Sequence, residues 1–246
     1  MPRGSLVKHA LPSCPVIPAL DLSSEEEALE LVRALSPPCE IFKIGLRLFC
    51  RGGPDFVRRL AGETGAKIFL DLKLHDIPRT VATAVRELRS LNVTFVTVHI
   101  SGGREMIRAA VEAAEEGMAV LGVTVLTSLS AEASQKIFGV SEPESAVLRF
   151  ARWAVEERLA GVVASPLEVA PIRERFSREE LLVVTPGIRL SEKERRGDDD
   201  QARAATPRKA FSEGADYLVV GRPLYESKKP REVLEEILSE YEELRR

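Results

Sequence analysis

Short apolar runs alternate with stretches of helical periodicity along the chain. Almost continuously apolar strands, each followed by a helix, are typical of a parallel sheet covered by helices. The predicted strands lie at 15–20, 40–46, 67–72, 93–100, 118–126, 161–165, 181–188 and 216–221. The predicted helices lie at 25–35, 54–61, 78–90, 103–116, 144–158, 166–175, 202–213 and 230–245. The pattern therefore predicts eight strand–helix units.

Eight such units in 246 residues match the size of a (β/α)8 TIM barrel of the α/β class. A doubly wound open sheet is the competing architecture. No linker or break in composition divides the chain, so we expect one catalytic domain over residues 15–246. Residues 1–14 are expected to be an N-terminal extension, to which we assign no role. The charged segment 191–203 is expected to be a loop within the barrel.

Composition excludes several classes of protein. Lys and Arg total 35 against 38 Asp and Glu, so no basic excess points to nucleic acid or an anionic membrane. No apolar run reaches the ~18 residues of a transmembrane helix, and the first residues lack the apolar core of a secretory signal. The three cysteines have no CxxC spacing, so we expect neither a disulfide framework nor a structural zinc site. We expect a cytoplasmic protein.

Polar residues stand at the predicted carboxyl ends of the strands. In a barrel these ends meet at one face, where active sites form. The residues are Asp21, Lys43, Asp71, Lys73, Asp76, His99, Thr127, Ser128, Ser165, Arg189, Gly221 and Arg222. Any one of them is more often structural than functional, but their coincidence at one end of a barrel indicates a site.

The segment DLKLHD at 71–76 carries the densest group of charges. Because a strand has a period of two, Asp71 and Lys73 are expected on the same side. Lys43 on the adjacent strand and Asp76 in the following loop could complete an alternating array of carboxylates and lysines. One interpretation is a salt-bridge network closing the barrel mouth. The other is catalysis. Burying such charges costs several kcal/mol per ion, and a buried cluster of this kind usually persists where a charged substrate needs it.

A second group follows the last two predicted strands, where barrels often bind phosphate. Gly221 would let backbone N–H groups approach an anion, and Arg222 supplies a charged fork. Arg189 and Gln201, after the seventh strand, could close over the same anion. His99 is interpreted as a hydrogen-bonded packing residue, and the spacing of the histidines predicts no metal site.

With these residues in place, the chain resembles the bacterial type of the orotidine 5'-monophosphate decarboxylase family. The most specific match is D-x-K-x-x-D at Asp71, Lys73 and Asp76, within DLKLHDIPRT. The resemblance runs over nearly the whole chain and includes, in the family's order, the segments PVIPALD, FKIG, VTVLTS, VTPGIR, DDQ and VVGRP.

The resemblance implies a homodimeric barrel with active sites at the subunit interface. It would convert orotidine 5'-monophosphate to uridine 5'-monophosphate in de novo pyrimidine biosynthesis, with no cofactor and no metal. Lys73 would be the proton donor, with Asp71 beside the substrate carboxylate. Asp76 would come from the partner subunit. The implied binding residues are Asp21 and Lys43 for ribose, Asp71 for the substrate carboxylate, Thr127 for the pyrimidine, Gln201 for pyrimidine and phosphate, Arg189, Gly221 and Arg222 for phosphate, and Ile77 and Thr80 near Asp76.

One position departs from the family pattern, and two other functions compete. Arg79 stands where the family usually has Asn, which leaves the local interface contacts open. A sugar-phosphate decarboxylase or hexulose-phosphate synthase of the same suite also carries D-x-K-x-x-D, but uses Mg²⁺. A barrel that only binds a phosphorylated ligand is the third possibility. The LHDIPRT continuation, the Thr127–Ser128 pair and the loop containing Gln201 favour the pyrimidine nucleotide, and the intact Lys73 argues against a pure binder.

Overall fold

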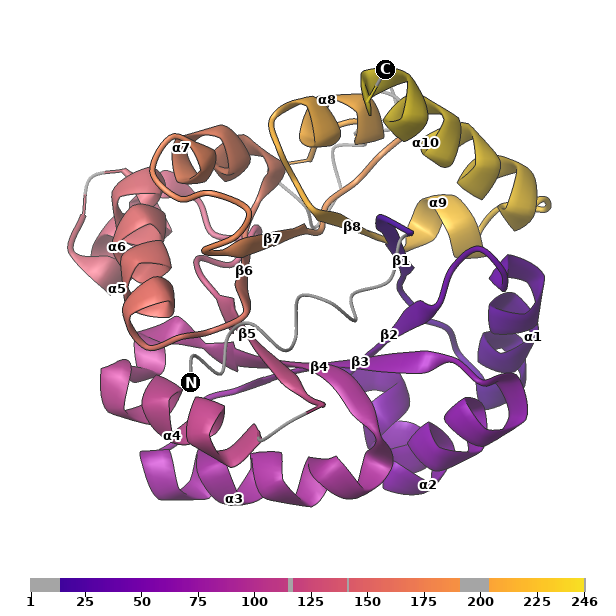
Figure 1. Ribbon diagram of the computed structural model, residues 1–246, viewed down its shortest axis with the longest axis horizontal. Helices are drawn as coiled ribbons and strands as arrows, with labels where there is room; N and C mark the ends of the chain where they lie inside the picture. Colours follow the sequence, from indigo (N-terminus) through magenta and orange to yellow (C-terminus); the bar gives the residue numbers. More distant parts are fainter. Residues whose placement is uncertain (1–13, 115–116, 141, 191–203, 246) are drawn as a thin grey trace.

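Parallel strands form a ring with helices around its outside in the computed structural model of the chain (Figure 1). The structure describes residues 14–114, 117–140, 142–190 and 204–245. Within these residues there are eight strands, and each consecutive pair from β2 to β8 is hydrogen-bonded in parallel. β8 pairs with β1, and a bridge between Ala19 and Lys43 joins β1 to β2. The predicted (β/α)8 barrel is confirmed.

The strands fall within or close to the predicted apolar runs. They are β1 (Val16–Pro18), β2 (Ile41–Gly45), β3 (Lys67–Leu74), β4 (Val93–His99), β5 (Ala119–Val123), β6 (Gly161–Val163), β7 (Leu182–Thr185) and β8 (Tyr217–Val220).

Most helices also lie where periodicity predicts them. The helices of the described residues are α1 (Glu25–Leu35), α2 (Leu46–Thr64), α3 (Pro78–Leu88), α4 (Arg104–Ala114), α5 (Ala131–Phe138), α6 (Pro143–Glu156), α7 (Val169–Arg173), α8 (Pro207–Ser212), α9 (Arg222–Tyr225) and α10 (Pro230–Arg245). Short 3-10 turns are η3 (Arg89–Leu91), η4 (Ile100–Gly102) and η5 (Pro166–Glu168). α1 begins at the predicted residue because Ser24 and Glu27 form a capping box.

Three helices differ from the prediction. α2 begins at Leu46, well before the predicted residue 54, and a non-helical Gly53 next to Pro54 separates its two parts. The pattern does not predict the short helix α9 or the helix α5, which has only eight residues. The Ser130 side chain caps its first turn, and Gly139 ends it at φ 68°.

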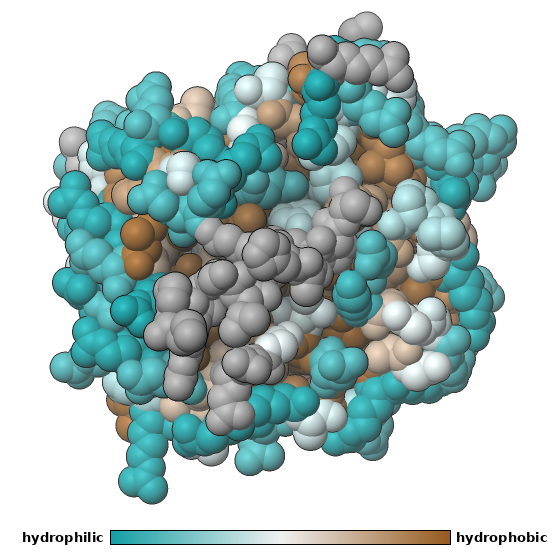
Figure 2. All heavy atoms as spheres, in the orientation of Figure 1, coloured by the Kyte–Doolittle hydropathy of each residue, from teal (hydrophilic) through white to brown (hydrophobic). Residues whose placement is uncertain are grey.

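The core has two layers. Inside the ring, Phe69, Phe95 and Tyr217 pack edge to face, with ring centroids 5.8 and 6.2 Å apart. A larger apolar layer fills the space between the strands and the helices. Figure 2 shows hydrophilic side chains over most of the outer rim in the same orientation. The barrel interior is therefore packed, and its polar groups gather at the strand ends.

The register of β3 against β4 is irregular near the carboxyl end of β3. Leu70 pairs with Val96 and Leu74 pairs with Val98, so three residues of β3 face the single residue Thr97 of β4. A bulge of this kind re-aims side chains and is common beside active sites. Asp71 and Lys73 lie within it.

Cys14 and Cys39 are buried, Cys50 is exposed, and all three are free thiols. Among the described residues, no helix combines the length and the apolar character needed to cross a membrane. The expected N-terminal extension lies, apart from Cys14, outside the described residues.

Candidate functional site

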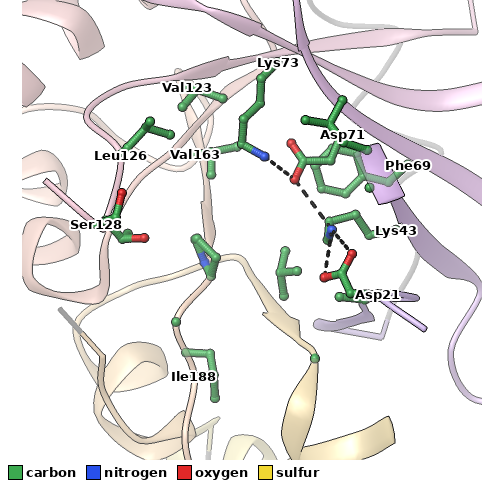
Figure 3. Close-up of a pocket in the computed structure, with 18 of the residues that line it drawn as sticks. Asp21, Lys43, Phe69, Asp71, Lys73, Val123, Leu126, Ser128, Val163 and Ile188 are labelled. Carbon is green, nitrogen blue, oxygen red and sulfur yellow. Dashed lines mark hydrogen bonds and ion pairs between the residues drawn. The ribbon is translucent and has the colours of Figure 1, made fainter. Parts of the chain in front are cut away.

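A cavity of about 620 Å³ opens at the carboxyl ends of the strands (Figure 3). This is the size typical of small-ligand sites, roughly 300–1,000 Å³. Seven of the eight strand ends contribute to its wall, and β4 does not. The predicted residues that line it are Asp21, Lys43, Asp71, Lys73, Thr127, Ser128, Arg189, Gly221 and Arg222.

Four of these side chains form a chain of alternating charge (Figure 3). The Lys73 Nζ lies 2.6 Å from an Asp71 oxygen, and the Lys43 Nζ lies 3.6 Å from the same oxygen. Lys43 also lies 3.3 Å from Asp21. The Asp71 side chain is only 12% exposed, whereas that of Lys73 is 30% exposed. Lys73 is thus the ammonium of the array that a ligand reaches most readily.

Gly45 leaves room for the array at the end of β2. A Cβ atom there would lie 2.7 Å from an Asp21 oxygen and 3.0 Å from the Lys43 Nζ. Both distances are shorter than ordinary van der Waals contact, so a larger residue would displace the ends of the Asp21 and Lys43 side chains. The glycine of the segment FKIG therefore has a specific structural role beside Lys43.

Lys73 adopts an unusual backbone conformation within the bulge. Its φ is +50°, in the left-handed region that non-glycine residues rarely occupy. The Lys73 N–H donates a hydrogen bond of 2.9 Å to the hydroxyl of Thr97, and that hydroxyl donates one of 2.9 Å to Asp71. The expected side-by-side placement of Asp71 and Lys73 is thus reached through a bulge and not through a regular strand.

The charges around Asp71 keep its carboxylate ionised. Burial is the largest single influence and would raise the pKa of Asp71. The ammonium groups of Lys43 and Lys73, together with the hydrogen bonds that Asp71 accepts, nevertheless hold this pKa below its ordinary value. The ionised Asp71 thus stabilises the folded protein at pH values above its ordinary pKa of about 3.9. This contribution is lost as the pH falls through the lowered pKa of Asp71.

His75 and His99 pack against each other behind Lys73. Their ring centroids are 5.5 Å apart and the rings are tilted by 41°. Burial is the main cause that lowers the pKa of His99 below 6.5, and the neighbouring His75 and Lys73 lower it further. Asp71 raises this pKa by a smaller amount. Burial and the nearby positive charge thus favour the neutral imidazole of His99.

The ends of β7 and β8 carry the predicted anion-binding residues that line the cavity. Gly187, which follows β7, has φ 78° and needs the freedom of glycine to turn the chain. The buried Arg189 donates a hydrogen bond of 2.8 Å to the carbonyl of Ile188. Gly221 and Arg222 continue this wall at the end of β8. Two arginines thus face the cavity from the loops after β7 and β8.

Apolar side chains also line the cavity. They include Phe69, Val123, Leu126, Val163 and Ile188 (Figure 3). Side chains of this type lower the local dielectric constant and strengthen any charge interaction made there. The cavity therefore combines charged groups with apolar walls, which suits a ligand that has a flat ring and an anionic group.

The structure does not bring every predicted residue into this cavity. Asp76, Ile77 and Thr80 are exposed and lie outside the cavity wall. Asp76 accepts a hydrogen bond from the Ile77 N–H, at 2.6 Å. Gln201 lies outside the described residues. Within one chain, Asp21 and not Asp76 supplies the second carboxylate of the array.

Sequence reasoning missed two residues next to the array. Thr97 is a completely buried threonine within an apolar strand, and Gly45 directly follows the apolar run that contains Lys43. The sequence signal for Thr97 was a polar residue within a mostly apolar strand, two positions before His99, because a buried polar group needs a hydrogen-bond partner. The structure supplies that partner only because β3 is bulged.

No three His, Cys, Asp or Glu side chains of the described residues come together as metal ligands. Asp21 and Asp71, the two carboxylates of the array, both contact Lys43.

Several known proteins similar to this chain are orotidine 5'-phosphate decarboxylases. The profile of the Orotidine 5'-phosphate decarboxylase / HUMPS family matches residues 15–237. An orotidine 5'-phosphate decarboxylase of Dictyoglomus turgidum is 43% identical over 240 residues, which cover 94% of this chain and 96% of that protein. One of Anaeromyxobacter dehalogenans is 46% identical over 219 residues, covering 89% and 94%. The crystal structure of the Lactobacillus acidophilus orotidine 5'-phosphate decarboxylase superposes with a TM-score of 0.79 at 36% identity, covering 93% of this chain and 99% of that one.

Proposed function

Because the chain belongs to the orotidine 5'-phosphate decarboxylase / HUMPS family, we propose that it converts orotidine 5'-monophosphate to uridine 5'-monophosphate in pyrimidine biosynthesis. The observation that carries this proposal is the pair formed by Lys73 and the buried Asp71, 2.6 Å apart at the cavity wall. Such a pair places a fixed ammonium and a fixed carboxylate at the point where a substrate would lose carbon dioxide.

The proposed reaction needs an ammonium at the reacting carbon. Loss of carbon dioxide leaves an electron pair in the plane of the pyrimidine ring, where it cannot delocalise into the π system. Preorganised charge can stabilise that pair, and Lys73 both supplies the charge and donates the proton that ends the reaction. Asp71 holds the Lys73 ammonium in place through their contact of 2.6 Å, and lies beside the departing carboxylate.

The residues that line the cavity support separate roles in binding the ribose, the pyrimidine and the phosphate. Asp21 and Lys43 hold the ribose hydroxyls, and Thr127 contacts the pyrimidine. Arg189, Gly221 and Arg222 hold the phosphate, with Gln201 between phosphate and pyrimidine. The phosphate is remote from the reacting carbon, so its binding energy can be used to close and desolvate the site.

The position of Asp76 supports a homodimer with shared sites. Asp76 is exposed and outside its own chain's cavity, next to Ile77, which is 65% exposed. An exposed apolar side chain beside a charged motif residue is suited to a contact between subunits. In this proposal, Asp76, Ile77 and Thr80 complete the array of the partner subunit.

The test of the proposed function is the consumption of orotidine 5'-monophosphate, followed by its absorbance, after exhaustive dialysis against EDTA. We expect full activity and uridine 5'-monophosphate as the product, because the carbanion meets Lys73 and not a cation. The contact of Lys43 with both carboxylates of the array supports this expectation, since it occupies the groups that a cation would use. Loss of activity with EDTA that Mg²⁺ restores would contradict the metal-free mechanism. Turnover of a hexulose phosphate or a sugar-acid phosphate instead of the nucleotide would place the chain with the Mg²⁺-dependent members of its family.

Mixed dimers test the shared site. Lys73→Ala and Asp76→Ala subunits are each expected to be inactive, but mixing them should restore up to half the wild-type activity per mixed dimer. One site of such a dimer carries both substitutions and the other carries neither. If fully exchanged mixed dimers stay inactive, both residues act within one subunit's site and the proposed role of Asp76 is wrong.

A further inference from the structure

Thr97 is a buried polar side chain in the middle of β4, between Val96 and Val98. Its exposed fraction is 0%, and it lies behind the charged array instead of in the cavity wall. A buried threonine usually satisfies its hydroxyl on a neighbouring carbonyl, as Thr124 does with the carbonyl of Val163 at 2.9 Å. The Thr97 hydroxyl instead contacts two groups of the array, the backbone of Lys73 and the carboxylate of Asp71.

The first contact stabilises the unusual backbone of Lys73. Three residues of β3 face Thr97 alone, so the regular ladder between the two strands is interrupted there. The Thr97 hydroxyl accepts the Lys73 N–H at 2.9 Å, a position that a carbonyl of the adjacent strand holds in a regular ladder. Left-handed backbone persists in a non-glycine residue only where its surroundings fix it. Thr97 supplies one of the bonds that fix it.

The second contact orients Asp71. The Thr97 hydroxyl donates to Oδ1, at 2.9 Å, while Oδ2 faces the ammonium groups of Lys73 at 2.6 Å and Lys43 at 3.6 Å. A carboxylate with one oxygen held in this way cannot rotate without breaking a buried hydrogen bond. One hydroxyl thus sets both the plane of the Asp71 carboxylate and the point from which the Lys73 side chain starts.

We propose that Thr97 is a positioning residue for the decarboxylation, which acts by holding Asp71 and Lys73 in their relative geometry. This inference rests on the proposed function, because it assigns Thr97 to the same reaction. Thr97 itself touches no substrate. Its removal should therefore lower kcat and leave KM for the nucleotide nearly unchanged, since the phosphate and ribose contacts are made elsewhere in the cavity.

The test compares Thr97→Val with Thr97→Ser. Valine keeps the shape and removes the hydroxyl, whereas serine keeps the hydroxyl and removes the methyl group. We expect Thr97→Val to lower kcat by about 10²-fold, the effect of misplacing a reacting group by about 1 Å. Thr97→Ser should stay within a few-fold of wild type. Thr124→Val is the matched control, because it removes a buried threonine hydroxyl bond elsewhere in the barrel and should keep wild-type kcat.

Crystal structures of the two Thr97 variants provide a readout that is independent of activity. Thr97→Val should change φ of Lys73 or rotate the Asp71 carboxylate, and Thr97→Ser should preserve both. An unchanged array in Thr97→Val, or kcat within a few-fold of wild type, would overturn the proposal. Equal loss of kcat in Thr97→Val and Thr97→Ser would assign the effect to packing. A rise in KM alone would assign the effect to binding. Either result would overturn the proposal. If the wild-type protein does not consume the nucleotide, the proposed function fails, and the structures still decide whether Thr97 positions the array.

Discussion

Replacement of Lys73 by alanine is expected to lower kcat for orotidine 5'-monophosphate by several orders of magnitude. Removing a general acid or base alone usually costs about 10²–10⁴-fold. Lys73 has two roles in the proposed reaction, because its ammonium first stabilises the developing carbanion and then protonates it. The substitution also leaves Asp71 beside the substrate carboxylate without the cation that lies 2.6 Å from it. We therefore expect a loss greater than the usual range, measured as single-turnover consumption of the nucleotide.

Lys67→Ala is the matched control for this variant. Lys67 begins the same strand, at the opposite end from the cavity, and pairs with Glu40 at 3.0 Å on the surface. The control should keep wild-type turnover, since exposed ion pairs contribute only about 0–1 kcal/mol to stability. Circular dichroism establishes that both variants fold. A Lys73→Ala protein that keeps a tenth of wild-type turnover would make Lys73 a structural residue.

Replacement of Arg222 by alanine is expected to cost about 2–5 kcal/mol in transition-state stabilisation with the phosphorylated nucleotide, which is roughly 30-fold to several thousand-fold in kcat/KM. Arg222 follows Gly221 at the end of β8 and lines the same cavity as the array. A guanidinium in this place can form charge-assisted, bidentate hydrogen bonds to the phosphate. The measurement is kcat/KM of the variant and of the wild-type protein.

Orotidine without its phosphate provides the control for Arg222. This truncated substrate never makes the phosphate contact, so its kcat/KM should change little in the variant. Misfolding would instead lower activity with both substrates alike. Arg231→Ala, on the surface helix α10, should affect neither substrate. Equal losses with both substrates in Arg222→Ala would show that Arg222 supports the barrel, and the assignment of the phosphate site to the loops after β7 and β8 would be wrong.

The barrel could be predicted from the sequence because its signals are local. Each strand is an apolar run short enough to cross the barrel once, and a helix such as 25–35 is marked by its own cap and acidic first turn. The early start of α2 and the helix α5 could not be predicted in this way. Leu46–Gly52 precedes a glycine and a proline that normally end a helix, and Ala131–Phe138 has only eight residues, too few for a helical period to stand out.

The site could be predicted only in part, because its geometry depends on contacts between strands. The two-residue period of a β-strand was enough to expect Asp71 and Lys73 on the same side of their strand. The bulge that brings them together, and the partnership of both with Thr97, depend on the register of β3 against β4, which no single segment encodes. The contact of Lys43 with Asp21 depends likewise on the space left by Gly45. Asp76 follows Lys73 closely in sequence, yet its own chain holds it outside the cavity.

The central claim is that one cavity holds the pyrimidine ring against Lys73 and the phosphate against Arg222. A crystal structure of the wild-type protein with uridine 5'-monophosphate tests this claim most directly. The account predicts that the ring carbon which carried the carboxylate lies within about 3.5 Å of the Lys73 Nζ, the reach of a near-attack geometry. It also predicts that the phosphate contacts the Arg222 guanidinium. A nucleotide bound with that carbon turned away from Lys73, or bound outside this cavity, would contradict the account.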